Sequence, residues 1–231
     1  MESPQAIIDR AIERHGGIAA YDLVGSIRIG LSRMSGLVPR MKGLGTTFNL
    51  PGQIVVNPHL LTAQFLYEDE TVEYDNGKVR ANGFTNSNYR RRFRGIRKLR
   101  LWKKIDACYF FGYALAGYFS FPFALDGQEI LGHGVASNGA SWVEVAFPPG
   151  VDTHSQKQRF WFDESGLLVR NDYCADIIGP VFWGAHYSKG YCFESPIPIA
   201  TTRTVKLRLG RFAFPFTVLS AKFTIESVSM Q

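Results

Sequence analysis

Residues 71–81 have the sequence TVEYDNGKVRA, in which Asp75-Asn76-Gly77 separates two short runs of alternating apolar and polar residues. Asn-Gly and Asp-Gly pairs favour the left-handed backbone of the tightest two-residue hairpins. The stretch therefore predicts two antiparallel strands, residues 71–74 and 78–81, joined by a short turn.

The same alternation continues outward in both directions. Toward the N-terminus, Ile27, Ile29 and Leu31 alternate with polar or small residues, and toward the C-terminus the segments 203–209 and 217–228 alternate in the same way. Such a period of two predicts strands with one dry and one wet face. In total the sequence predicts ten or eleven strands, and a sheet of that size must curl rather than stay flat.

Two helical segments interrupt this pattern. Residues 3–15 form an amphipathic helix, with Ser3-Pro4 as its start and Gly16-Gly17 as its stop. A helical insert is expected at about 86–125, and it contains the most apolar stretch of the chain, 107–125. Because glycines and Pro122 interrupt this stretch, it is better explained as a buried helix than as a membrane span. No linker divides the chain, so residues 1–231 are expected to form one ligand-binding domain. The fold class is mainly β (α+β): a single curved antiparallel sheet, forming a half-barrel or open barrel around an apolar cavity that the helices cover.

Composition narrows the class of protein. The chain is 45% hydrophobic and 14% aromatic, which fits either bulky core packing or a cavity that binds rings. Its N-terminal residues are too charged for a secretory signal, so we expect a cytoplasmic protein. Cys108, Cys174 and Cys192 have no metal-ligand spacing and are expected to be buried apolar residues.

The positive charge is concentrated in one run. The net charge is +6, and most of the excess lies in residues 90–104. Such a run is usually a solvated face, but it also fits anionic lipid, nucleic acid, or arginines at a cavity mouth that attract an acidic ligand. No nucleic-acid-binding motif accompanies it, so we expect neither a nucleic-acid partner nor stable membrane insertion.

No motif for a metal, a nucleotide or a serine nucleophile is present, so any catalysis is expected to be acid–base work without a cofactor or metal. His154 is expected to start a strand after Pro148-Pro149-Gly150, where it acts as a proton carrier or, alternatively, as a loop cap that hydrogen-bonds the backbone. The carboxylates of Glu144, Asp172 and Asp176 are expected either to act as acids or bases in an apolar pocket or to pair with arginines. The candidates for proton transfer are His154, His186, Glu144, Asp172, Asp176 and Tyr173.

The aromatic segment 183–193 sets a constraint on this choice. Trp183 and Tyr187 share one face of the expected strand and His186 has the other, so the aromatic stripe and the histidine cannot both line the cavity without a bulge. Arginines are expected to hold a substrate carboxylate and aromatic residues its rings. The candidates for substrate binding are Arg159, Arg170, Trp161, Trp183, Tyr187, Tyr113 and Tyr118.

Several stretches resemble a family of small bacterial proteins related to the lipoprotein-carrier (LolA-like) half-barrel. They include 14–18, 109–115, the segment THSQKQRFWFD at 153–163, and Ala185-His186-Tyr187. Within that group the chain looks most similar to the cyanobacterial cyclases of scytonemin biosynthesis. No catalytic residue is carried over from them, because no catalytic motif matches residue by residue.

That resemblance implies a function in secondary metabolism. The implied activity is a cofactor-independent cyclase, with decarboxylation, acting on an aromatic, indole-type β-keto acid in pigment biosynthesis. The alternative is a non-catalytic carrier or binding protein for a hydrophobic small molecule or lipid. The expected partner is an aromatic small molecule, and the expected state is a monomer or homodimer.

Overall fold

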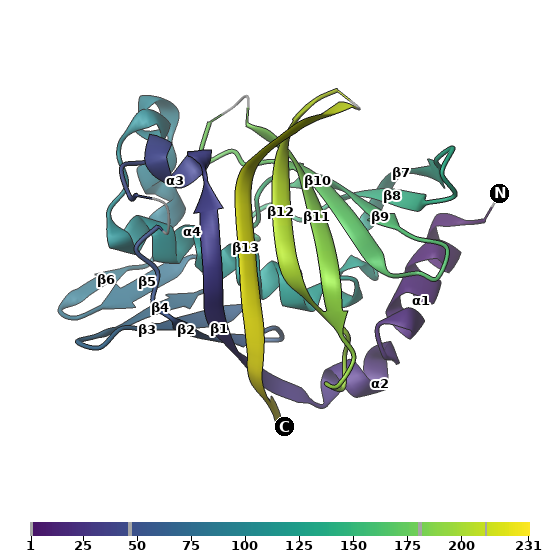
Figure 1. Ribbon diagram of the computed structural model, residues 1–231, viewed down its shortest axis with the longest axis horizontal. Helices are drawn as coiled ribbons and strands as arrows, with labels where there is room; N and C mark the ends of the chain where they lie inside the picture. The colour runs from purple at the N-terminus through teal and green to yellow at the C-terminus, as the bar shows by residue number, and fades with distance from the viewer. Residues whose placement is uncertain (1, 46–47, 180–181, 211) are drawn as a thin grey trace.

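All strands of the protein belong to one antiparallel sheet. The computed structural model describes residues 2–45, 48–179, 182–210 and 212–231. In this part of the chain thirteen strands pair in the order β6-β5-β4-β3-β2-β1-β13-β12-β11-β10-β9-β8-β7. Strands β6 and β7 are the two free edges, so the sheet bends without closing (Figure 1).

The strand bounds follow the alternation of the sequence, with short connections between most neighbours. The strands are β1 (Val24–Gly36), β2 (Gln53–Asn57), β3 (Thr62–Leu66), β4 (Thr71–Asp75), β5 (Lys78–Ala81), β6 (Phe84–Asn86), β7 (Glu129–Val135), β8 (Ser141–Ala146), β9 (Lys157–Phe162), β10 (Leu168–Cys174), β11 (Trp183–Cys192), β12 (Ile199–Leu209) and β13 (Phe212–Met230). The helices are α1 (Pro4–Arg14), α2 (Gly17–Asp22), α3 (Leu37–Met41) and α4 (Lys104–Ser120), with short 3-10 turns η1 (Tyr89–Phe93), η2 (Gly95–Leu99) and η3 (Phe123–Leu125).

The pairing of β1 with β13 joins the two halves of the sheet. Ile27 lies opposite Val228, and Leu31 lies opposite Phe223, across a ladder that runs from Val24 to Gly36. Three register shifts interrupt this ladder. Bulges of this kind increase the local twist and bend, which lets so many strands wrap around a helix.

Helix α4 occupies the space that the concave face encloses. The side chains from Ala107 to Ala116 are all buried, on every side of the helix. A helix that is apolar all round must be buried on all sides, and the curved sheet supplies that environment. Its first turn is fixed by Asp106, which accepts hydrogen bonds from the Lys103 amide at 2.8 Å and the Tyr89 hydroxyl at 2.8 Å.

Helix α1 packs against strands β7 and β8, at one edge of the sheet (Figure 1). Its N-cap is Ser3, whose hydroxyl accepts from the Ala6 amide at 3.2 Å. The buried stripe consists of Ile7, Ile8, Ala11 and Ile12. The amphipathic pattern of the sequence therefore corresponds to one face of a real helix.

The predicted fold class, a curved antiparallel half-barrel with few helices, is confirmed. Thirteen strands form among the described residues rather than ten or eleven, partly because β6 is only three residues long and carries no alternation that reveals it. Within the helical insert expected at about 86–125, the α-helix covers Lys104–Ser120 and the rest is 3-10 turns and loop. The apolar cavity is smaller than the sequence predicts, because α4 fills most of the space inside the curved sheet.

No helix among the described residues is long and apolar enough to cross a membrane.

Two glycines of α4 provide a matched test of how tightly the helix fits the sheet. A Cβ on Gly112 would lie 2.4 Å from Cβ and Cγ of Tyr74 on β4, whereas a Cβ on Gly117 would meet nothing nearer than 3.6 Å. We expect Gly112→Ala to lower the free energy of unfolding by about 1 to 3 kcal/mol through overpacking. Gly117→Ala should raise it by up to about 1 kcal/mol through helix propensity. Urea denaturation measures both, and equal effects of the two changes would contradict this packing.

Candidate functional site

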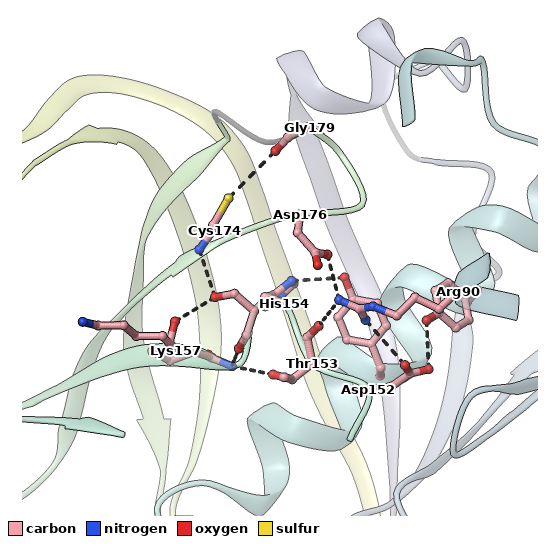
Figure 2. Close-up of polar contacts among 12 residues, drawn as sticks. Arg90, Asp152, Thr153, His154, Lys157, Cys174, Asp176 and Gly179 are labelled. Atoms are coloured by element: carbon pink, nitrogen blue, oxygen red, sulfur yellow. Dashed lines mark hydrogen bonds and ion pairs between the residues drawn. The ribbon is translucent and has the colours of Figure 1, made fainter. Parts of the chain in front are cut away.

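The loop before β9 is held by its own Ser155 on one side and by the side chain of Arg90 on the other. The Ser155 hydroxyl donates to the Lys157 carbonyl at 2.8 Å and accepts from the Cys174 amide at 3.2 Å. From the other side, Arg90 of η1 donates to the Thr153 carbonyl at 2.9 Å. Figure 2 shows His154 between these two attachments. His154, which lies in the loop and not at the start of a strand, is 3% exposed.

Arg90 closes the gap between the insert and this loop. Its guanidinium lies 2.7 Å from the Asp176 carboxylate and 3.5 Å from that of Asp152 (Figure 2). The Tyr109 hydroxyl of α4 donates to Asp152 at 2.8 Å. The first basic residue of the run 90–104 is therefore a structural cross-link at the rim of the half-barrel, and Asp176 is its partner rather than an unpaired acid.

Behind the loop, histidines and tyrosines form one continuous buried chain of polar contacts. The two ring nitrogens of His154 lie 3.3 Å from the Tyr113 hydroxyl and 2.7 Å from the Tyr118 hydroxyl. The chain continues through Tyr173, whose hydroxyl is 3.3 Å from that of Tyr118 and 3.4 Å from Nδ1 of His186. Five side chains from α4, the loop, β10 and β11 thus connect two imidazoles through phenol groups.

Burial keeps both imidazoles neutral. Desolvation lowers the pKa of His154 to about 3, and Arg90 adds to the effect. Desolvation also holds the pKa of His186 well below its ordinary value, helped by the nearby Arg203. A neutral imidazole has one donor and one acceptor nitrogen, so His154 can accept from one phenol and donate to the other. Among the described residues, nothing contacts Nε2 of His186 by a hydrogen bond.

Arg203 on β12 is the unusual charge of the interior. It is 7% exposed, it donates to the Ser188 hydroxyl at 2.8 Å, and its guanidinium lies 4.8 Å from the centre of the Tyr118 ring. In the described part of the chain no carboxylate pairs with it, and its Nε has no hydrogen-bond partner. Desolvation lowers the pKa of this guanidinium. A buried arginine usually has an anionic partner, and here the protein supplies none within its described residues.

Several cavities lie around this buried cluster, and three of them bear on the site. A narrow apolar slot of about 20 Å³ reaches Arg203, His186 and Tyr118, and its other walls are Leu31, Met34, Leu50, Ile54, Phe110, Phe111, Leu115, Val205, Leu219, Ala221 and Phe223. A mostly apolar pocket of about 180 Å³ reaches Tyr113 from another face of α4. A polar recess of about 500 Å³ lies over the ion pairs of Arg90.

The structure divides the sequence-predicted site residues between the two faces of the sheet. His154, His186, Tyr173, Tyr113 and Tyr118 come together inside, as described above. The register puts the other strand candidates on the outer face: Glu144, Arg159, Trp161, Arg170, Asp172, Trp183 and Tyr187. The strand parity thus separates His186 from the aromatic stripe, and this second group does not line the interior.

On the outer face these residues contact one another. Arg159 pairs with Glu144 at 2.8 Å, and its guanidinium lies 4.0 Å from the centre of the Trp142 ring. Arg170 pairs with Asp172 at 2.6 Å. The Asp172 carboxylate also accepts from the Trp161 indole at 3.1 Å. Both arginines that were expected to hold a substrate carboxylate therefore already have a carboxylate partner.

Arg203 is not among the site residues predicted from the sequence, although the parity of its strand places it on the inner face. It has the same parity as Val205 and Leu207, which the alternation places on the apolar face of the strand. The sequence does contain one indication of this buried arginine, since it begins a row of apolar residues on the same face of the strand. Its separation from every acid cannot be obtained from the sequence, because that depends on which strands become neighbours.

The described residues contain no group of three or more His, Cys, Asp or Glu placed to hold a metal ion.

Comparisons with known proteins give two structural likenesses. No family model and no curated protein matches the chain. A LolA superfamily protein from Nitrosomonas europaea aligns over 100% of this chain and 94% of its own, at 8% identity and a TM-score of 0.47. A DUF1329 family protein from Desulfovibrio piger aligns over the same shares, at 10% identity and a TM-score of 0.41. Neither likeness carries information about activity.

The buried histidines make the stability of the protein depend on pH. In the unfolded chain each histidine binds a proton near pH 6.5, whereas the folded-state pKa is about 4 for His15 and about 3 for His154, with burial as the main cause. The neutral folded form is therefore fully stable above pH 6.5 and loses stability as the pH falls. Each such histidine contributes a slope of about 1.4 kcal/mol per pH unit.

We expect the free energy of unfolding of the His154→Gln variant to fall less steeply between pH 6.5 and 5 than that of the parent. Urea denaturation at several pH values measures both slopes. His59, which is only half-buried, provides the control variant His59→Gln. An unchanged slope in His154→Gln would show that His154 is accessible to protons in the folded protein.

Proposed function

We propose that the protein binds a hydrophobic small molecule that carries an acidic group, with the apolar part in the slot and the acid on Arg203. The observation that carries this proposal is a guanidinium that is buried at the end of an apolar slot and has no carboxylate partner among the described residues. A carboxylate matches the forked donors of arginine and removes the cost of burying the charge alone.

The chemistry of the slot suits an amphipathic ligand. Phe110 and Phe111 of α4 face Leu31 and Phe223 of the sheet, and these four side chains supply both aromatic and aliphatic contacts. The polar lining residues are Tyr118, His186 and Arg203, and they lie together: the Tyr118 ring centre is 4.8 Å from the Arg203 guanidinium and 4.5 Å from the His186 ring centre. A few convergent polar groups in an otherwise apolar pocket are typical of sites for small molecules.

Ligand entry requires the slot to widen. A volume of about 20 Å³ is enough for one water molecule and no more. One wall is formed by Leu50, which belongs to the connection between α3 and β2 and lies outside any strand. We propose that the Leu50 side chain moves outward when the ligand enters, since strands β1 and β13 on the other wall are fixed by their ladder.

The proposed binding is tested with dodecanoic acid and 3-indolebutyric acid, each compared with its methyl ester, by titration calorimetry. Arg203→Met should weaken binding of the acids by about 10- to 100-fold, the effect of one or two charge-assisted hydrogen bonds, and leave the esters nearly unaffected. Arg208→Met, which removes an arginine of the same strand on the outer face, is the matched control. Equal loss for acids and esters would exclude an acid-binding role of Arg203.

The same variant has a second, independent readout. Because the guanidinium is buried with an unpartnered Nε, we expect Arg203→Met to raise the free energy of unfolding of the ligand-free protein by roughly 1 to 3 kcal/mol. A residue that is retained for binding at a cost in stability behaves in this way. If urea denaturation shows a loss of stability instead, Arg203 serves the fold.

The histidine–tyrosine chain favours a second candidate, acid–base chemistry on the bound acid. His186 lines the slot beside Arg203 with a free nitrogen, and protons could pass along the phenols to His154. The cofactor-independent cyclisation and decarboxylation of an indole-type β-keto acid, as in scytonemin biosynthesis, is the specific reaction proposed for this site. It ranks second because an arginine on a carboxylate stabilises the ground state, which retards loss of carbon dioxide.

This second candidate has a direct assay. Incubation with a coupled indole-pyruvate-type β-keto acid should release carbon dioxide faster than buffer, and His186→Gln should lower the rate by about 100-fold or more, the usual contribution of a general acid or base. His59→Gln is again the control. A rate equal to that in buffer would remove this reaction and leave the binding function in place.

A further inference from the structure

One end of the half-barrel carries an unusual surface, which we call the upper rim. It consists of the described residues of four segments: 36–44 with α3, 93–101 with η2, 177–179 with 182–183, and the β12–β13 hairpin at 207–210 and 212–219. In Figure 1 α3 and this hairpin lie at the upper end of the sheet, opposite α2 and the C-terminus. The hairpin extends past the end of β1, because Gly36 pairs with Leu219 and β13 begins seven residues earlier.

Hydrogen bonds and packing hold the segments together. The Lys42 ammonium donates to the Ile178 carbonyl at 3.1 Å, and the Trp102 amide donates to the Lys42 carbonyl at 2.8 Å. Val38 and Val218 line one small cavity together with Ile178 and Trp183. The upper rim is therefore one continuous surface built from segments distant in the sequence.

Large apolar side chains are exposed on this rim. Ile96 is 84% exposed, Leu99 71% and Leu209 69%. Most of the strongly exposed large hydrophobic side chains of the described residues belong to the rim: Leu37, Met41, Ile96, Leu99, Leu101, Trp183, Leu209, Phe212, Phe214 and Phe216. Single exposed apolar residues are common on protein surfaces. So many at one end of the molecule indicate a surface that contacts another protein or a membrane.

The charge of the rim is of one sign. The described residues of the four rim segments contain seven of the 26 Lys and Arg residues of the protein and none of its 20 Asp and Glu residues. Arg40, Arg94 and Arg97 are exposed and have no side-chain hydrogen bond or ion pair among the described residues. The rim thus combines uncompensated positive charge with apolar side chains.

We propose that the upper rim docks the protein on the surface of an anionic lipid bilayer. Basic residues near a negatively charged bilayer surface and apolar side chains inserted at its boundary reinforce each other in peripheral binding. This combination distinguishes a bilayer from other occupants. A nucleic acid offers no phase for the exposed Ile96 and Leu99, and a second copy of the chain would bring like charges together.

The docking goes beyond the proposed binding function and does not depend on Arg203. The two are connected by position, since Met34 and Leu219 of the slot lie within two residues of Gly36 or opposite it in the ladder. When the protein docks by its upper rim, the part of the slot that Met34 and Leu219 line is the part nearest the lipid. A hydrophobic ligand then passes between bilayer and slot with little exposure to water.

The test is vesicle co-sedimentation of the full chain at about 100 mM salt. The probes are vesicles of phosphatidylcholine alone and vesicles containing 30% phosphatidylglycerol. We expect partitioning onto the anionic vesicles at least tenfold stronger than onto the neutral ones, weakening as salt is raised. The charge variant is Arg40→Glu with Arg97→Glu, and its matched control is Lys189→Glu with Lys222→Glu, two exposed lysines elsewhere on the sheet.

The apolar contribution has its own pair of variants. Ile96→Ser with Phe216→Ser removes two exposed rim side chains, and Leu23→Ser with Leu60→Ser removes two exposed ones outside the rim. Each rim variant should lose at least tenfold in partitioning, and each control should bind within twofold of the parent. Circular dichroism confirms that all four fold, as expected for exposed positions.

Three results would overturn the proposal: equal partitioning onto neutral and anionic vesicles, equal losses in rim and control variants, or no vesicle binding together with a dimer that the rim variants dissociate. The last result would assign the rim to self-association. Arg203→Met should bind vesicles like the parent, so failure of the acid-binding function leaves the docking result unaffected, and failure of docking leaves the acid titration unaffected.

Discussion

The structure depends on one constraint, which is that helix α4 is apolar on every side and must be buried on every side. A flat sheet can cover one face of such a helix, whereas a sheet that bends around it covers most of the circumference. The bulges between β1 and β13, the absence of a side chain at Gly112 and the small remaining slot are consequences of this demand. The curvature of the half-barrel thus follows from the helix that it encloses, and any ligand competes with α4 for the space inside the sheet.

The polar groups of the interior follow from the same constraint. Tyr113 and Tyr118 project from α4 into the buried interior, so their hydroxyls need partners there, and His154 and Tyr173 provide them. The Tyr173 hydroxyl in turn contacts Nδ1 of His186. A chain of neutral groups satisfies its own hydrogen bonds without a net charge. Arg203 is the exception, since it brings a charge into this region and leaves it unbalanced among the described residues.

Much of the fold could be predicted from the sequence because alternation is a local property. The hairpin around Asn76-Gly77, the strand of Val205 and Leu207, the helix at 3–15 and the buried helix before Pro122 all follow from patterns of a few residues. The site could be predicted only in part. Both histidines and three of the tyrosines lie inside, but Arg170 and Asp172 face outward. Which face of a strand is inside depends on contacts between strands far apart in sequence, and no local pattern in 168–174 contains that information.

The order of the strands has a consequence for how the chain reaches this fold. Strands β1 and β13 are neighbours in the middle of the sheet, although about 190 residues separate Gly36 from Met230 in the chain. The two halves, β2 to β6 and β7 to β12, remain unconnected until β13 has left the ribosome and inserted beside β1. Loop closure over such a separation is slow, and until then the apolar α4 has only part of its cover. The nascent chain is therefore most prone to aggregation before β13 has paired with β1.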